Sequence, residues 1–87
     1  MSPAIHRERG YVFYFRMYDL LHEPPHVHVG KGSDTGGASD AKIWLDPIAV
    51  ARAGRFGTQE LNRMLRIVEK RRKQFLEEWN HYAQRGR

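Results

Sequence analysis

Two consecutive prolines, Pro24 and Pro25, constrain the fold of this chain more than any other feature of its sequence. A proline fixes its own φ angle and offers no backbone N–H donor. The residue before each proline is biased toward extended conformations. The chain is therefore expected to enter the segment that follows stiff and extended.

That segment, His26-Val27-His28-Val29, alternates with a period of two. Such alternation is typical of a half-buried strand, whose successive side chains point to opposite faces of a sheet. The valines are the natural core contacts. The pattern therefore predicts that both imidazoles lie on the opposite, more accessible face.

Other hydrophobic patterns predict the rest of the sheet. Strands are expected at about 10–18, 26–30 and 40–46, and a short fourth strand at 48–52 is an open alternative. Residues 1–9 read as a polar lead in which Pro3 to Ile5 add a few extended residues. In the first strand the residues expected to face the core are Tyr11, Phe13, Phe15 and Met17, and those expected on the other face are Val12, Tyr14, Arg16 and Tyr18. In the third, Ala41, Ile43 and Leu45 point inward and Lys42, Trp44 and Asp46 outward.

A long C-terminal helix is predicted over residues 58–83. Thr58 suits the N-cap and Glu60 the positive end of the helix dipole. The expected apolar stripe is Leu61, Leu65, Val68, Phe75, Leu76 and Trp79, with Met64 and Tyr82 at its edge. At 1.5 Å per residue the helix spans roughly 38 Å, so its end should protrude or pack against another subunit. Arg72 interrupts the stripe, either snorkelling to water or facing a partner or a buried carboxylate.

These elements predict an α+β fold in one domain, residues 1–87. The sheet has three or four antiparallel strands, and the helix packs on one face. The opposite face carries the histidines and the outward aromatic residues.

Composition narrows the class of protein. The net charge is +5, which favours acidic partners such as nucleic acid or an acidic protein. Cysteine is absent, so disulfides and thiolate metal sites are excluded. Without a signal-like start or an apolar run long enough to cross a membrane, the expectation is a cytoplasmic protein with no membrane contact. The loop from Gly30 to Gly37 contains Gly-Lys, but it lacks the order of a phosphate-binding loop.

The histidines allow several kinds of chemistry. His26 and His28 could act as a general acid and base, with Arg16 or Lys42 stabilising phosphate charge. Alternatively, His22, His26 and His28 could bind a divalent metal, with Glu23 or Asp46 as an oxygen ligand, although no cofactor is required by the sequence. The third interpretation is that they are polar residues on a solvated face.

The same sheet face could instead be a binding surface without catalytic chemistry. Aromatic and cationic side chains on an open sheet face can stack on bases and hold phosphates. The candidate binding residues are Tyr14, Arg16, Tyr18, His22, Glu23, Lys42 and Trp44. The opposite face of the helix is basic, with Arg63, Arg66, Lys70 and Lys73 interrupted by Glu77. It is either a solvated face or a nucleic-acid patch.

The strings HEPPHVHV and AKIWLDP, a helix entry with glycine and phenylalanine, and a long charged helix ending in EEW resemble the domain of unknown function 4160 family. The matching positions are His22, Glu23, Pro24, Pro25, His26, His28, Trp44, Asp46, Pro47 and Trp79. The loop of residues 30–40 looks longer than is usual in that family. The resemblance implies a small prokaryotic protein encoded beside another small domain, in pairs suggested to be toxin–antitoxin modules.

Three functions follow as expectations. The leading one is a toxin–antitoxin-type component whose histidine and aromatic sheet face binds a small protein partner and can also take RNA or DNA. The alternatives are a histidine- or metal-dependent ribonuclease-like enzyme and a non-catalytic protein-interaction module. The sequence does not distinguish toxin from antitoxin, and it leaves a homo-oligomer open.

Overall fold

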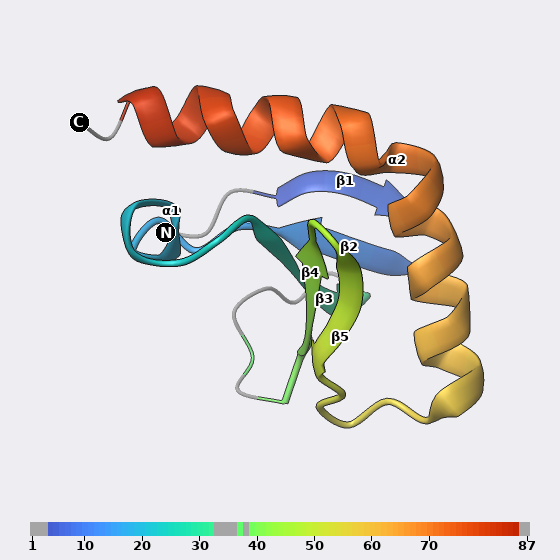
Figure 1. Ribbon diagram of the computed structural model, residues 1–87. Coiled ribbons are helices and arrows are strands. Elements are labelled where there is room, and N and C mark those ends of the chain that lie inside the picture. Colours follow the sequence, from blue (N-terminus) through green and yellow to red (C-terminus); the bar gives the residue numbers. More distant parts are fainter. Residues whose placement is uncertain (1–3, 33–36, 38, 86–87) are drawn as a thin grey trace.

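Five antiparallel strands follow one another across a single sheet in chain order, so each strand pairs with the next (Figure 1). The computed structural model describes residues 4–32, 37 and 39–85. The elements are β1 (Ala4–Glu8), β2 (Tyr11–Tyr14), α1 (Asp19–His22), β3 (His26–Lys31), β4 (Ala41–Leu45), β5 (Ile48–Arg52) and α2 (Thr58–Arg85). The predicted α+β class is confirmed, with one or two more strands than expected.

The additional strand is β1, at an edge of the sheet. Its sequence, AIHRE, is mostly polar and its residues are exposed or half-buried, so it carries little hydrophobic alternation. It is joined to β2 by a two-residue turn in which Arg9 and Gly10 have φ angles of 54° and 82°. Positive φ at both positions is typical of the hairpin turn whose twist matches that of the flanking strands. The turn geometry therefore pairs residues 4–8 with β2, although their sequence predicts only a polar lead.

The helix α2 covers one face of the sheet, and the core lies between them (Figure 1). Phe13 and Phe75 are fully buried, with ring centroids 5.5 Å apart. The buried helix residues are Met64, Ile67, Val68, Phe75 and Trp79. Met64 thus lies in the buried stripe and not at its edge, Ile67 joins it, and Leu61, Leu65 and Leu76 are only half-buried.

The C-terminal part of α2 packs against residues of the same chain. It ends at Arg85, and Figure 1 shows it turning over the sheet toward α1. The rings of Trp79 and Tyr82 lie 5.1 and 6.0 Å from that of Phe15. Arg72 donates from Nε to the carbonyl oxygen of Leu45 at 2.7 Å, and it pairs with the exposed carboxylate of Asp46 at 3.0 Å. Arg72 therefore fastens the helix to the end of β4.

The second face of the sheet is not the open surface that the alternation predicts. Val12 and Tyr14 are completely buried there. The hydroxyl group of Tyr14 donates to the buried carboxylate of Asp40 at 2.6 Å. Met17, by contrast, is 45% exposed, because β2 ends at Tyr14 and the strand alternation no longer applies to it.

A close backbone contact joins residues 54 and 55 to the segment that carries Asp40. The amide of Arg55 donates to the carbonyl of Ser39 at 2.9 Å. A Cβ atom on Gly54, whose φ is 62°, would lie 2.2 Å from the same carbonyl oxygen, so only glycine fits.

Residues 33–36, which belong to the predicted glycine-rich loop, lie outside the described residues. In the part of the chain that the structure describes, no helix is long and apolar enough to cross a membrane.

Candidate functional site

Two histidines of β3 and one aspartate of α1 form a buried cluster. Oδ2 of Asp19 lies 2.9 Å from Nε2 of His26 and 2.9 Å from Nε2 of His28. His26 is 0% and His28 2% exposed, and the Asp19 side chain is 11% exposed. The predicted accessibility of the two imidazoles is therefore wrong, because α1 brings a carboxylate onto the rings.

Local geometry explains how the cluster forms. The prolines deliver an extended chain into β3, and strand alternation places both imidazoles on one face. The short helix α1 then turns Asp19 back toward them. Nδ1 of His26 donates to the carbonyl oxygen of Pro24 at 2.8 Å, so the proline segment also orients the imidazole ring.

The protonation of His28 follows from its surroundings. Burial lowers the pKa of His28 to about 4, against the raising effect of its hydrogen bond to Asp19. A neutral His28 donates from Nε2 to Asp19, which leaves a lone pair on Nδ1. That Nδ1 atom is buried and has no hydrogen-bond partner among the described residues.

Asp19 remains ionised. Burial raises its pKa, but the hydrogen bonds from His28 and His26 outweigh burial, so the pKa lies below its usual value of 3.8. The ring of Tyr14 stacks on His28 with centroids 5.3 Å apart. The cluster is thus a buried carboxylate between two imidazoles, walled by an aromatic ring.

The structure separates His22 from the other two histidines. His22 is exposed, stacks on the Tyr18 ring at a centroid distance of 3.9 Å, and bonds the Tyr18 carbonyl. The two oxygen ligands considered for a metal, Glu23 and Asp46, pair instead with Lys42 and Arg72. The predicted metal set of His22, His26 and His28 is therefore not assembled; Asp19 takes the place of His22.

Asp19 itself was not identified as a site residue from the sequence. It stands seven positions before His26, across the prolines, in a stretch that reads as a connection. Its only signal is that it is the nearest aspartate on the N-terminal side of the histidine strand. A carboxylate at that position meets the strand only if a turn of helix reverses the chain.

The aromatic residues and cations expected on an open face are only partly available. Tyr14 is buried, Trp44 and Arg16 are half-buried, and Tyr18 is 70% exposed. The Lys42 ammonium group lies 4.5 Å from the centroid of the Trp44 ring while it also pairs with Glu23. The described part of the chain thus presents no extended stacking platform for bases on this face.

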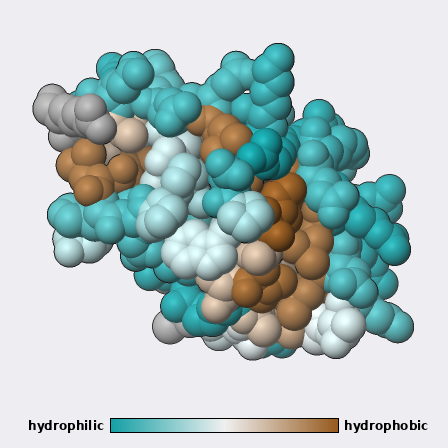
Figure 2. All heavy atoms as spheres, in the orientation of Figure 1, coloured by the Kyte–Doolittle hydropathy of each residue, from teal (hydrophilic) through white to brown (hydrophobic). Residues whose placement is uncertain are grey.

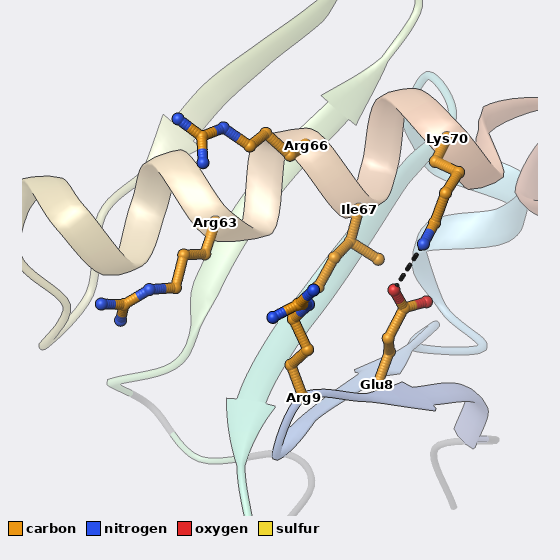
Figure 3. Close-up of a pocket in the computed structure, with 6 residues that line it drawn as sticks. All are labelled: Glu8, Arg9, Arg63, Arg66, Ile67 and Lys70. Atoms are coloured by element: carbon orange, nitrogen blue, oxygen red, sulfur yellow. Dashed lines mark hydrogen bonds and ion pairs between the residues drawn. The ribbon is translucent and has the colours of Figure 1, made fainter.

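A second candidate site lies where the β1–β2 turn meets α2. It is a pocket of about 280 Å³ lined by Glu8, Arg9, Arg63, Arg66, Ile67 and Lys70. Figure 3 shows Arg9 rising from the turn toward the helix, while Arg63 extends below the helix in this view and Arg66 above it. Four of the six lining side chains are cationic and one is anionic.

The single carboxylate of this pocket is already neutralised. Glu8 accepts from Lys70 at 2.8 Å and from Arg71 at 3.3 Å, and it contacts His6 at 2.8 Å. The hydrogen bond with His6, followed by that from Lys70, lowers the pKa of Glu8 to about 2. Among the described residues no carboxylate pairs with Arg9, Arg63 or Arg66. The pocket therefore presents free guanidinium groups.

The chain matches one known family. The model of the family described as Domain of unknown function (DUF4160) matches residues 10–80. The chain belongs to this family. The matched region contains Asp19, His26 and His28 and the helix residues of the basic pocket, whereas β1 and Arg9 precede it. No curated protein and no solved structure matches the chain.

Proposed function

We propose that this DUF4160 protein binds nucleic acid through the basic pocket between the β1–β2 turn and α2. The observation that carries this proposal is the set of three guanidinium side chains, Arg9, Arg63 and Arg66, that line one pocket with Lys70 and have no carboxylate partners among the described residues. Guanidinium groups bind phosphate oxygens through paired hydrogen bonds, which makes arginine a preferred residue for phosphate recognition.

The spacing on the helix suits a polyanion. From Arg63 to Lys70 the helix rises about 10 Å at 1.5 Å per residue. One strand of DNA carries a phosphate about every 3.4 Å along the axis, so the stripe faces about three phosphates. A row of this length fits a strand better than it fits a single phosphate ion.

Arg9 adds an independent argument. It is the one described residue other than glycine with a positive φ angle, 54°. This conformation is uncommon for an arginine, and asparagine or glycine would occupy the turn at lower cost. The turn thus retains a strained cation at the mouth of the pocket, as expected where local strain serves binding.

The wider biological role rests on the family resemblance. In a toxin–antitoxin-type pair this chain would act in the cytoplasm, bind its small protein partner and contact RNA or DNA through the pocket. Induced expression of the chain alone, compared with co-expression of its neighbouring gene, tests this role. Growth arrest that the neighbour relieves is expected if the chain is a toxin; normal growth of both strains leaves the antitoxin role as the version to test by partner binding.

Binding is measured by fluorescence anisotropy of a labelled single-stranded RNA and of a labelled DNA duplex over a range of salt concentrations. We expect affinity to fall steeply with salt, and the double variant Arg63→Ala/Arg66→Ala to reduce the salt slope by about two. The matched control is Arg52→Ala/Arg85→Ala, which removes the same charge from exposed positions outside the pocket. No binding by the wild-type protein at low salt, or equal loss in both double variants, would contradict the proposal.

The ribonuclease-like alternative has less support. A general acid and base must come within hydrogen-bond reach of the substrate. His26 and His28 are almost completely buried, and Nε2 of each lies 2.9 Å from Oδ2 of Asp19. Substrate would therefore have to displace α1 before it could reach either ring.

A second candidate function is binding of the small protein partner through α1. Met17, Tyr18 and Leu21 are 45%, 70% and 49% exposed, which is unusual for three neighbouring large hydrophobic side chains. Figure 2 shows a hydrophobic area over α1 and a second one over β4 and β5. Leu21→Asp should abolish a stoichiometric complex with the product of the neighbouring gene, and Val50→Asp, at the second area, should leave it intact.

A further inference from the structure

The His26 ring is placed between two oxygen atoms that can only accept hydrogen bonds. One is the Pro24 carbonyl oxygen, 2.8 Å from Nδ1, and the other is Oδ2 of the ionised Asp19, 2.9 Å from Nε2. If the Nδ1–H donates to Pro24, a neutral ring turns the Nε2 lone pair toward the carboxylate. Two lone pairs repel each other at this distance unless a cation lies between them. That cation is either a proton or a metal ion.

Two further observations favour a metal ion. A nitrogen of His26, a nitrogen of His28 and a carboxylate oxygen of Asp19 lie within 4.8 Å of one another. Metal-bound histidine commonly donates its other ring N–H to a backbone carbonyl, and His26 already makes this bond to Pro24.

We propose that Asp19, His26 and His28 form a binding site for a divalent transition-metal ion of the zinc type. The site is independent of the proposed nucleic-acid pocket, because the two share no residue; its contact with α2 is at Trp79, whose ring centroid lies 5.1 Å from that of His26.

Binding of the ion requires a movement of all three side chains. Tetrahedral Zn²⁺ with bonds of about 2.0–2.1 Å holds neighbouring ligand atoms about 3.3–3.4 Å apart. The two nitrogen–oxygen distances are 2.9 Å, so each must lengthen by about 0.4 Å to admit the ion. The two imidazole nitrogens, which lie within 4.8 Å of each other, must also come to about 3.4 Å, so the ion repositions both rings as well as the Asp19 carboxylate.

The donor set also selects the class of metal. Two imidazole nitrogens and one carboxylate oxygen suit Zn²⁺ and its neighbours in the first transition series. Ca²⁺ requires six to eight oxygen ligands, and Mg²⁺ keeps an octahedral shell of oxygens. A bound ion would tie α1 to β3, which gives a small domain without cysteine a crosslink within its fold.

The test is a titration of the full chain with Co²⁺, a spectroscopically visible substitute for Zn²⁺, after dialysis against a chelator. We expect one Co²⁺ per chain, intense visible absorption typical of four-coordinate cobalt, and its loss when Zn²⁺ displaces the ion. NMR of histidine nitrogens should show Zn²⁺ shifting Nε2 of both His26 and His28. A folded wild-type chain that takes up no Co²⁺ would overturn the proposal, because the cation at His26 would then be a proton.

Variants distinguish this site from adventitious binding by surface histidines. Asp19→Asn and His28→Gln should each abolish the absorption, while His22→Gln, which changes an exposed histidine outside the cluster, should retain it. Loss in His22→Gln, or retention in both cluster variants, would overturn the assignment. If a cluster variant does not fold, the wild-type NMR shifts alone decide, since only His26 and His28 should respond.

Discussion

Asp19 and His28 lie nine residues apart in the sequence, and Oδ2 of the aspartate is 2.9 Å from Nε2 of the histidine in a nearly water-free setting. The same oxygen meets Nε2 of His26. One carboxylate thus anchors the short helix α1 to two positions of β3. The segment that is most distinctive in the sequence is therefore organised by a residue outside it.

Removing this anchor should destabilise the fold strongly. Asp19→Ala leaves two buried imidazoles without the carboxylate that they share, and each buried polar group left without its hydrogen-bond partner costs about 1–3 kcal/mol. The free energy of unfolding in urea measures the effect, in protein freed of metal by a chelator. His22→Ala, at an exposed position, should change it by less than about 1 kcal/mol. Equal effects of the two variants would mean that the cluster does not hold α1 in place.

Acid should weaken the attachment of β1 to α2 through Glu8. Because the folded-state pKa of Glu8 is about 2 and its usual value is 4.5, the ionised carboxylate stabilises the fold fully above pH 4.5. That contribution is lost as the pH falls from 4.5 toward 2, where Glu8 takes up a proton in both states. Melting temperatures of the wild type and Glu8→Gln should thus differ at neutral pH and converge toward pH 2. A difference that stays constant across this range would show that the Glu8 charge plays no part.

The contact between Tyr14 and Asp40 predicts an unequal effect of two chemically identical substitutions. Tyr14→Phe removes a 2.6 Å hydrogen bond to a buried carboxylate and should cost about 2 kcal/mol, since hydrogen bonds to charged groups are stronger than average. Tyr18→Phe removes a hydroxyl group from a side chain that is 70% exposed and should be nearly neutral. Chemical denaturation of both variants provides the comparison; a neutral Tyr14→Phe would contradict a closed second face.

Arg9 should show opposite effects on stability and on binding. Asparagine tolerates the positive φ of the turn better than arginine, so Arg9→Asn should stabilise the protein by about 0.5 kcal/mol. The same change removes a cation from the pocket and should reduce the salt slope of nucleic-acid binding by about one. Thermal melts and anisotropy titrations of the same preparation measure both quantities. Unchanged binding would exclude Arg9 from the interface.

Much of the fold could be predicted from local pattern. The prolines, the alternation from His26 to Val29 and the apolar period after Thr58 predict β3 and α2 because they depend only on backbone constraint and side-chain periodicity. The strand β1 could not be predicted in this way. Its residues are polar, and a turn with two positive φ angles pairs it with β2.

The same distinction between local pattern and contacts between elements applies to the candidate sites. The sequence by itself determined that His26 and His28 share one face of a strand, and that Arg63, Arg66 and Lys70 lie along one side of a helix, because each set belongs to a single element. Only the tertiary structure decided that Asp19 joins the histidines, that His22 does not, and that Arg9 faces the helix cations. Those contacts join separate elements, and they form when the chain reverses at α1 and at the β1–β2 turn. Burial of the second sheet face has the same origin, since the alternation of one strand carries no information about what packs against it.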